Sequence, residues 1–192
     1  MRKRIDYSNG YYIGEVSLFG GKKQGLGSYY WNGGDSYSGE WYDDDMHGSG
    51  VYHYASGNEY AGDWVHDKKH GYGKFTWADG TYYSGQLTND KMTGYGEKHF
   101  TNGNWVEGHF VDSRANGECT FHYASGAKIV GSFKDGKPVE GTLYFAPSTE
   151  WRGEFVTGSF IDWNLHGQCI YTNKSGETYY CLYDHGKWLR RL

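Results

Sequence analysis

The sequence predicts an all-β protein, an elongated, twisted, single-layer antiparallel sheet of about 15 strands built from stacked β-hairpins. Three observations lead to this prediction. The chain of 192 residues contains 31 glycines and 19% aromatic residues but only 2 prolines, unlike the composition of disordered chains. It repeats itself with a period of 23 residues. Within each copy, large and small side chains alternate, as they do along a half-buried strand.

The period is most regular in the middle of the chain. Gly25, Gly48, Gly71, Gly94 and Gly117 follow one another at this spacing without slippage, which a flexible linker has no reason to maintain. The flanking copies are less regular, with two extra residues in the first, both prolines in a shortened one, and about five extra residues in a longer one. We therefore expect one array spanning 1–192, with about seven copies at 12–36, 37–59, 60–82, 83–105, 106–128, 129–150 and 151–178, and a partial copy at 179–192.

Each copy contains two strand patterns. In the copy "YAGDWVHDKKHGYGKFTWADGTY", Tyr60, Gly62 and Trp64 alternate with Ala61 and Asp63, which predicts a first strand. A second run of alternating residues predicts the returning strand, and in the preceding copy this run is "GSGVYHY". A polar tip such as "HDKKH" separates the two strands. The dipeptides in "ASGN", "ADGT" and "TNGN" favour positive φ and predict turns from one hairpin to the next.

The glycines are predicted to leave space for aromatic rings on the opposite strand. The expected register places Trp41 opposite Gly50 and Tyr52 opposite Gly39. The three cysteines occupy glycine positions of the pattern, which predicts small buried thiols. Their odd number and the absence of metal-ligand spacing indicate a reducing compartment. The cysteines concerned are Cys119, Cys169 and Cys181.

This compound pattern, Y-x-G-x-W, a polar tip, H-G-x-G and a turn glycine, resembles the MORN (membrane occupation and recognition nexus) repeat family. The resemblance covers about residues 12–190 and is strongest over 37–128. It implies a long, twisted antiparallel sheet without catalytic residues, in a protein that acts as a scaffold by binding partner proteins, dimerising or lying near membranes. Val106 and Ile129 replace the first tyrosine and Leu87 replaces the tryptophan, so the geometry is expected to be less regular after about residue 129.

Several classes of function are not expected. The net charge of −4 offers no general attraction for nucleic acid. The chain has neither a secretory signal nor an apolar run of about 18 residues, so a cytoplasmic protein is expected. "GYGK" at residues 71–74 lacks the remaining residues of a phosphate-binding loop. No catalytic residues and no cofactor are expected. A metal ion is not expected either, because His53, His99 and His122 share one repeat position, and equivalent positions of successive hairpins lie about 10 Å apart.

The aromatic face is one candidate site. If the sheet curls, its rings form a groove that binds a helix or an extended segment of a partner protein; if they cover one another, no groove remains. A non-enzymatic interaction scaffold is the predicted function. The rings expected to line the groove are those of Trp41, Trp64, Tyr54, Trp77, Phe100 and Tyr123.

Residues 158–167, "GSFIDWNLHG", are apolar where other tips are polar. They are expected to form either a second partner-binding loop or a flap that covers the end of the sheet. The apolar residues are Phe160, Ile161, Trp163 and Leu165.

A row of basic residues at the hairpin tips supports the alternative function, a peripheral membrane adaptor that binds anionic phospholipid. The other interpretation is that lysine is simply common at solvated tips. A homodimer and association with the cytoskeleton are further expectations. The row, which Asp45 interrupts, contains Lys22, Lys68, Lys91, Arg114 and Lys137.

Overall fold

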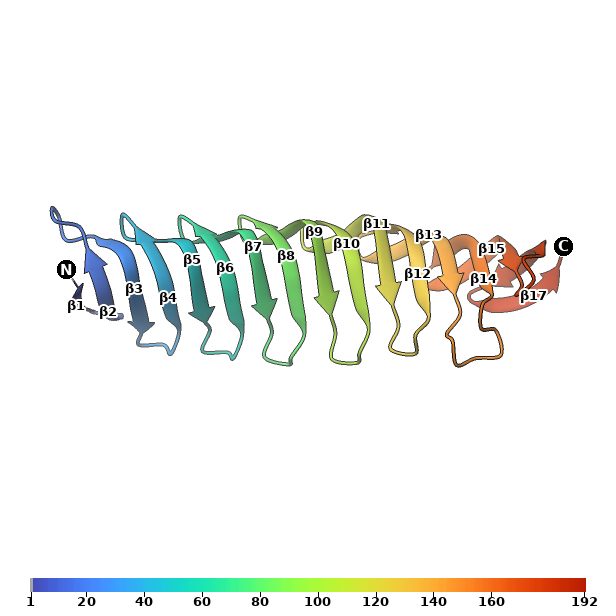
Figure 1. The fold of residues 1–192 in the computed structure, drawn as a ribbon, viewed down its shortest axis with the longest axis horizontal. Coiled ribbons are helices and arrows are strands. Elements are labelled where there is room, and N and C mark those ends of the chain that lie inside the picture. The colour runs from blue at the N-terminus through green and yellow to red at the C-terminus, as the bar shows by residue number, and fades with distance from the viewer. Residues whose placement is uncertain (1) are drawn as a thin grey trace. The chain divides into compact units, whose positions relative to one another are not determined.

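The computed structural model describes residues 2–192, and these residues form one antiparallel sheet of 17 strands without a helix. Strands that follow one another in the sequence are neighbours in the sheet (Figure 1). The chain divides into two compact units, residues 1–93 and 94–192. The first unit contains β1 (Arg2–Tyr7), β2 (Gly10–Val16), β3 (Lys23–Trp31), β4 (Ser36–Tyr42), β5 (Asp45–His53), β6 (Glu59–Val65), β7 (Lys68–Thr76) and β8 (Tyr82–Thr88).

Strand β9 (Lys91–His99) spans the division between the units. The second unit continues with β10 (Trp105–Val111), β11 (Arg114–His122), β12 (Lys128–Lys134), β13 (Lys137–Tyr144), β14 (Phe155–Ile161), β15 (Asn164–Thr172), β16 (Thr178–Asp184) and β17 (Lys187–Arg191). The predicted all-β antiparallel sheet is confirmed. Two strands exceed the expected number, because β1 precedes the first copy and the last, partial copy supplies both β16 and β17.

The hairpin tips are tight turns in which both central residues have positive φ. In the tip between β6 and β7, His66 and Asp67 have φ values of 47° and 63°, as a two-residue hairpin turn requires. The Asp67 N–H donates to the Met46 carbonyl at 3.1 Å, and Asp67 Oδ1 accepts from the Met46 N–H at 2.8 Å. The second tip residue makes the same backbone hydrogen bond to the preceding hairpin at Asp44, Asp90, Gly136 and Gly186.

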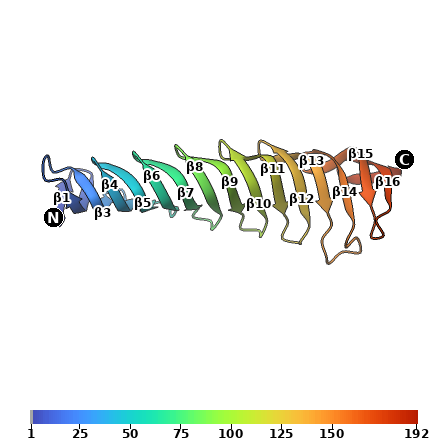
Figure 2. The same cartoon turned by 45° about the horizontal axis from the view of Figure 1, so that its top comes forward.

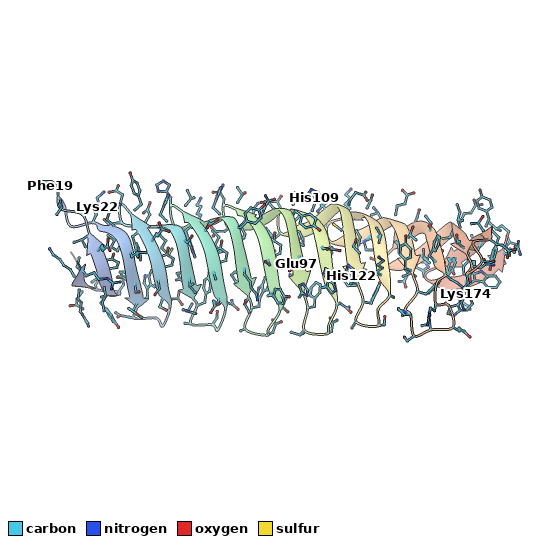
Figure 3. All side chains as sticks on the ribbon, viewed as in Figure 1. Phe19, Lys22, Glu97, His109, His122 and Lys174 are labelled. Atoms are coloured by element: carbon cyan, nitrogen blue, oxygen red, sulfur yellow. The ribbon has the colours of Figure 1, made fainter. Side chains whose placement is uncertain are left out.

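The opposite ends of the strands are joined by the predicted glycine turns, so tips lie along one edge of each unit and turns along the other (Figure 2). In the turn after β5, Gly57 has a φ of 87° and its N–H donates to the Tyr54 carbonyl at 2.8 Å. The Tyr54 N–H in turn donates to the Asn58 carbonyl at 2.9 Å. The first hairpin has a longer tip, residues 17–22, from which Phe19 and Lys22 project (Figure 3).

The predicted register within each hairpin is wrong. Gly39 lies opposite Gly50, not Tyr52, and Trp41 lies opposite Met46, not Gly50. The register shifts immediately after the Gly39–Gly50 pair, where Gly48 adopts a φ of 54°. A bulge of this kind places extra residues on one strand, and the alternation of side chains alone does not show it.

The paired glycines make room for the first tyrosine of their own hairpin. A Cβ at Gly50 would lie 2.3 Å from the Tyr37 hydroxyl oxygen and 2.4 Å from its Cε2 atom. The Tyr37 ring lies over the glycine pair, and its hydroxyl donates to the Glu40 carbonyl at 2.9 Å. The equivalent tyrosines of the first unit are fully buried and form the centre of its core; they are Tyr12, Tyr37, Tyr60 and Tyr83.

The second unit fills this space differently. Val106 and Val156 stand where the first unit has tyrosine, and Cys119 and Cys169 stand where it has glycine. A Cβ at Gly108 would lie 2.7 Å from Cys119 Sγ, so the thiol occupies the volume that a tyrosine ring fills elsewhere. All three cysteines are buried, as predicted. A smaller residue on one strand is thus balanced by a larger one on the other.

Candidate functional site

The aromatic face of the first unit carries a continuous series of ring contacts. Centroids are 5.4 Å apart between Trp31 and Tyr52, and 4.4 Å between Tyr52 and Tyr54. The series continues from Tyr54 to Phe75 at 5.9 Å and from Phe75 to Trp77 at 4.7 Å. Tyr54 and Trp77 are half-buried. These rings largely cover one another, which is the second of the two arrangements considered for this face.

Trp41 and Trp64 lie beneath this series rather than at its surface. They are 3% and 2% exposed, and their indole N–H groups donate to the Gly27 and Gly50 carbonyls at 3.0 and 3.3 Å. Both side chains belong to the core, although Trp41 also lines a cavity of about 340 Å³ together with Tyr29 and Trp31. Of the predicted groove residues in this unit, only Tyr54 and Trp77 keep substantial exposure.

Lys69 fills part of the same face. Its ammonium lies 3.0 Å from the Tyr54 hydroxyl and 3.0 Å from Asp90 Oδ1, and it is 5.7 Å from the centroid of Trp64. Burial lowers the pKa of Lys69, but the hydrogen bonds and charges of Tyr54 and Asp90 outweigh burial and raise it. The side chain therefore stays charged and occupies space that a partner would otherwise enter.

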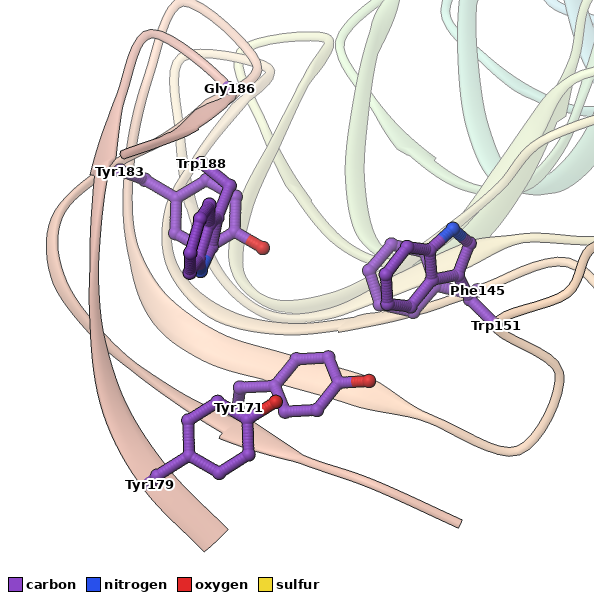
Figure 4. A pocket seen from close by; sticks show the side chains of 7 residues that line it. All are labelled: Phe145, Trp151, Tyr171, Tyr179, Tyr183, Gly186 and Trp188. Atoms are coloured by element: carbon purple, nitrogen blue, oxygen red, sulfur yellow. The ribbon is translucent and has the colours of Figure 1, made fainter. Parts of the chain in front are cut away.

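The second unit has open space along its aromatic face. A cavity of about 200 Å³ is lined by residues that include Tyr123, Phe160, Trp163 and Leu165. A larger cavity of about 370 Å³ adjoins it through three shared residues, Phe145, Tyr183 and Gly186. We call the two cavities together the C-terminal groove. The larger cavity, shown in Figure 4, is lined by Phe145, Trp151, Tyr171, Tyr179, Tyr183, Gly186 and Trp188.

The connection between β13 and β14 builds one wall of the larger cavity. This connection, residues 145–154, is held by successive turns in which Thr149 N–H donates to Ala146 O at 3.1 Å and Glu154 N–H donates to Trp151 O at 3.0 Å. It places Trp151 beside Phe145, with centroids 6.1 Å apart (Figure 4). The extra residues of the longer copy, 151–178, therefore lie before β14, not within residues 158–167.

The opposite wall and the floor come from the last two hairpins. Tyr171 and Tyr179 face each other across β15 and β16 with centroids 4.9 Å apart. Tyr183 and Trp188 are paired across β16 and β17, and Trp188 is 52% exposed. Figure 4 shows rings approaching the space from three sides.

The groove carries hydroxyl groups that remain protonated at neutral pH. Burial raises the pKa of Tyr183 to about 12. Burial also raises the pKa of Tyr171, whose hydroxyl donates a hydrogen bond to the Glu154 carboxylate. The groove thus offers aromatic faces and neutral hydroxyls rather than a charged centre.

Residues 158–167 do not form an inserted loop. They form the end of β14, a tip at Asp162 and Trp163, and the start of β15. Phe160 and Leu165 are 6% and 4% exposed, whereas Ile161 is 45% exposed. Phe160, Trp163 and Leu165 line the smaller cavity with Tyr123, so the structure joins two sites that the sequence analysis treated separately.

Trp163 combines an unfavourable backbone conformation with ring contacts. Its φ is 71°, which is rare for a bulky residue and costs about 1–3 kcal/mol. Its ring lies 4.6 Å from Phe121 and 6.1 Å from Phe133, measured between centroids. Phe100, the remaining predicted groove residue, contacts Phe121 at 6.4 Å.

The basic tip row is largely paired with acidic residues. Lys22 binds Asp43, Arg114 lies 3.7 Å from Asp135, and Lys137 lies 2.7 Å from Asp162. In each pair the acid belongs to the next hairpin tip. At Asp45 the acidic residue itself stands in the row, and its carboxylate contacts His66 on the following tip at 2.8 Å.

The remaining two positions of the row are Lys68 and Lys91. Lys68 and Lys91 are both exposed, at the starts of β7 and β9. No helix capable of spanning a membrane occurs among residues 2–192.

None of the residues that line the larger cavity was predicted from the sequence as a site residue. Three of these residues have equivalents in other copies. Tyr171 occupies the repeat position of Phe121, Phe145 that of Tyr123, and Tyr183 that of Trp64. Starting a regular copy at Val156 would have revealed the equivalence of Tyr171 and Phe121. Trp151 had no such signal, because it lies in the irregular connection. The missed lining residues are Phe145, Trp151, Tyr171, Tyr179, Tyr183 and Trp188.

Comparison with solved structures shows a similar fold in other proteins. The TCP domain of Drosophila melanogaster SAS-4 (dCPAP), solved in complex with a proline-rich motif of Ana2 (dSTIL), is 13% identical, with a TM-score of 0.53 over 93% of this chain and 88% of that chain. A mutant TCP10 domain of Danio rerio CPAP is 14% identical, with a TM-score of 0.41 over 99% and 98% of the two chains. No curated protein matches the sequence.

Five segments match the family model described as MORN repeat, and they follow the hairpin period of the structure. The matched segments are residues 12–36, 37–59, 60–82, 83–105 and 107–128. Because these matches cover more than half of the sequence, the chain belongs to the MORN repeat family.

Proposed function

We propose that this protein is an interaction scaffold whose C-terminal groove binds an extended, proline-containing segment of a partner protein. The observation that carries this proposal is the pair of adjoining cavities, of about 200 and 370 Å³, lined by aromatic rings. Concave, mainly apolar sites with a few polar groups are the usual form of a binding site.

An extended segment suits this groove better than a charged or bulky ligand. Proline-rich segments bind aromatic-lined grooves, because their backbone is already extended and their rings pack on flat aromatic surfaces. The Tyr183 hydroxyl provides a hydrogen-bond donor for a free carbonyl of such a segment, whereas the Tyr171 hydroxyl already donates to Glu154. The SAS-4 domain of similar fold, solved in complex with a proline-rich motif, is consistent with this class of partner.

The proposed role is binding rather than catalysis. Burial, followed by the effect of Cys181, raises the pKa of Cys169 to about 11, and burial also raises the pKa values of Cys119 and Cys181. Buried thiols held in the protonated form are poor nucleophiles. Their contacts serve packing instead.

The phospholipid alternative has weaker support. Lys22, Arg114 and Lys137 already face acidic partners on neighbouring tips, which reduces the positive potential available to a lipid surface. We therefore treat anionic vesicles as a comparison ligand in the test rather than as a second proposal.

The test is a titration of the purified full chain with a synthetic proline-rich peptide, followed by tryptophan fluorescence. We expect saturable binding that weakens about tenfold or more in Trp188→Ala, since one well-packed ring contributes over 1 kcal/mol. Tyr72→Ala is the matched control, because Tyr72 is 63% exposed and lies outside the groove. Trp151→Ala tests the other wall.

A second experiment tests partner binding without a synthetic peptide. A photo-reactive phenylalanine analogue at residue 188 should cross-link one protein partner through a single segment, whereas the same analogue at residue 72 should not. Equal cross-linking at both residues, or tight binding to anionic vesicles with no effect of Trp188→Ala on peptide binding, would contradict the proposal. Cross-links between two copies of this chain would indicate a homodimer instead.

A further inference from the structure

We propose that His166, Asp184 and His185 form a binding site for a divalent transition metal ion, with Zn²⁺ as the ion it suits best. This inference is independent of peptide binding by the C-terminal groove. One ligand-capable atom from each of the three residues lies within 4.8 Å of the other two. Two imidazole nitrogens and one carboxylate oxygen are ligands that zinc and neighbouring transition metals bind.

The distances suit a single ion. Asp184 Oδ1 lies 3.4 Å from His166 Nδ1 and 2.6 Å from His185 Nδ1. Two atoms that bind one Zn²⁺ at about 2.0–2.1 Å with tetrahedral angles are separated by roughly 3.3 Å. The first distance is already close to this value, and the second needs to lengthen by a fraction of an ångström when the ion takes the place of the hydrogen bond.

The sheet brings His166 beside Asp184 and His185, although it is distant from them in the sequence. Gly167 pairs with Tyr183, so continuing the β15–β16 register by one residue places His166 opposite Asp184. His185 follows in the tip between β16 and β17, where its φ is 45°. The site therefore consists of two cross-strand neighbours and one tip residue.

Backbone contacts hold the tip in place. The Gly186 N–H donates to the Leu165 carbonyl at 2.8 Å, which fastens the β16–β17 tip to the start of β15. The His185 N–H lies 3.4 Å from His166 Nδ1, a long hydrogen bond that metal binding would replace. The ring centroids of His166 and His185 are 4.8 Å apart. All three ligand atoms lie within 4.8 Å of one another, and rotation of the exposed His185 side chain can bring them to the roughly 3.3 Å that one ion requires.

The side chains are also accessible. His166 is half-buried, and Asp184 and His185 are exposed. Three protein ligands leave the fourth position of a tetrahedral ion for water, which such an exposed site can supply. Because successive side chains alternate between faces, Asp184 lies on the opposite side of the sheet from Tyr183, which lines the groove.

A similar histidine pair in the first unit provides an internal control. His47 and His66 occupy the same repeat positions as His166 and His185, and their ring centroids are 5.3 Å apart. Here the residue opposite His47 is Val65, because Gly48 pairs with Trp64. The pair therefore lacks the carboxylate that Asp184 supplies, and the Asp45 carboxylate contacts only His66 of the two rings.

Histidines that share one repeat position would lie too far apart in the sheet to bind one ion. His166 and His185 instead occupy different positions of successive copies, which the fold places side by side. Asp184 stands where the other copies carry residues such as Tyr42, Val65 and Thr88. The carboxylate is a local departure from the repeat.

The test uses the metal-free full chain, titrated with ZnCl₂ by calorimetry. We expect one equivalent to bind, with the affinity reduced at least tenfold in His185→Ala and in Asp184→Ala. His66→Ala is the matched control and should retain the wild-type affinity. Absorption of the Co²⁺-loaded chain should show the intense visible bands of a tetrahedral site, and Asp184→Ala should remove them.

Circular dichroism shows whether each variant is folded, and the exposed positions make unfolding unexpected. Zn²⁺ should also raise the melting temperature of the wild type and of His66→Ala, but not of His185→Ala. Unchanged affinity in His185→Ala and Asp184→Ala would overturn the proposal. So would several weak equivalents that all nine histidines share, because that result indicates nonspecific surface binding.

Discussion

In this sheet, the space left by neighbouring side chains determines which residue a position can hold. A Cβ at Gly73 would lie 2.4 Å from the Tyr60 hydroxyl oxygen and 2.5 Å from its Cε2 atom. The ring cannot move away, because Tyr60 is fully buried and its hydroxyl donates to the Asp63 carbonyl at 3.0 Å. Glycine is needed at Gly73 because any side chain would displace the ring beside it.

Gly73→Ala is therefore expected to lower the free energy of unfolding by about 1–3 kcal/mol, the usual cost of overpacking a filled core. Urea denaturation measures this change. Gly33→Ala is the control, since a Cβ at Gly33 has no atom within 4 Å and the residue is exposed. A stability loss at Gly33 equal to that at Gly73 would show that general glycine effects, not ring packing, are responsible.

The sequence predicted which residues are small, but not which ring each one accommodates. The glycine positions and the buried cysteines follow from the 23-residue period. The partner of Gly50 is Tyr37 rather than Trp41, because the bulge at Gly48 changes the register. A left-handed glycine inside an alternating strand leaves the alternation intact, so the pattern contains no sign of the shift.

At the scale of elements, the second residue of a hairpin tip has to meet two structural requirements at once. Asp67 must adopt a positive φ of 63°, and its carboxylate must accept the Met46 N–H at 2.8 Å. Asp44 and Asp90 make the same contacts to Lys23 and Lys69 at 2.8 and 3.1 Å. Aspartate and asparagine satisfy both demands, because they tolerate left-handed conformations and provide a side-chain oxygen.

Substitutions of Asp67 should separate these demands. Asp67→Asn keeps the acceptor and the tolerated φ, so we expect little change. Asp67→Gly keeps only the favourable φ, and Asp67→Ala keeps neither, so Ala should be the least stable, by about 1–2 kcal/mol. Thermal and urea unfolding would measure the order Asn, Gly, Ala. If Gly and Ala were equally destabilised, the backbone conformation would contribute nothing measurable.

The aromatic face shows how far elements could be inferred from sequence. Tyr54, Trp77, Phe100 and Tyr123 share one repeat position and are all half-buried, because the period is unbroken over these copies. The C-terminal groove was not found, since it depends on the irregular connection at residues 145–154. A segment that departs from the repeat has no neighbouring copies from which its position can be deduced.

At the scale of the whole molecule, the buried tyrosines make the stability of the fold fall at alkaline pH. Burial raises the pKa values of Tyr12 and Tyr83 to about 12, and it also raises those of Tyr37 and Tyr60. The unfolded chain loses these protons near pH 10, whereas the folded chain keeps them. The stabilising contribution is therefore complete below pH 10 and is lost as pH rises from about 10 through about 12.

We expect the urea midpoint to fall steeply between pH 10 and 12. The Tyr37→Phe/Tyr60→Phe variant should be less stable at pH 8, because it lacks two hydroxyl hydrogen bonds, but its midpoint should fall less over the alkaline range. The midpoint measured at each pH, at high salt to reduce the effect of surface ion pairs, checks this expectation. Parallel pH curves for the two proteins would contradict it.

The hydrogen bond from each tip to the preceding hairpin has a consequence for how such chains change in length. An extra copy inserted after residue 59 would bring its own tyrosine, glycine pair and tip aspartate, and would fit both neighbours. The sheet would gain two strands, about 10 Å, without altering any existing pairing. Duplication of whole copies therefore extends the protein in fixed steps, whereas shorter insertions are restricted to connections such as residues 17–22 and 145–154.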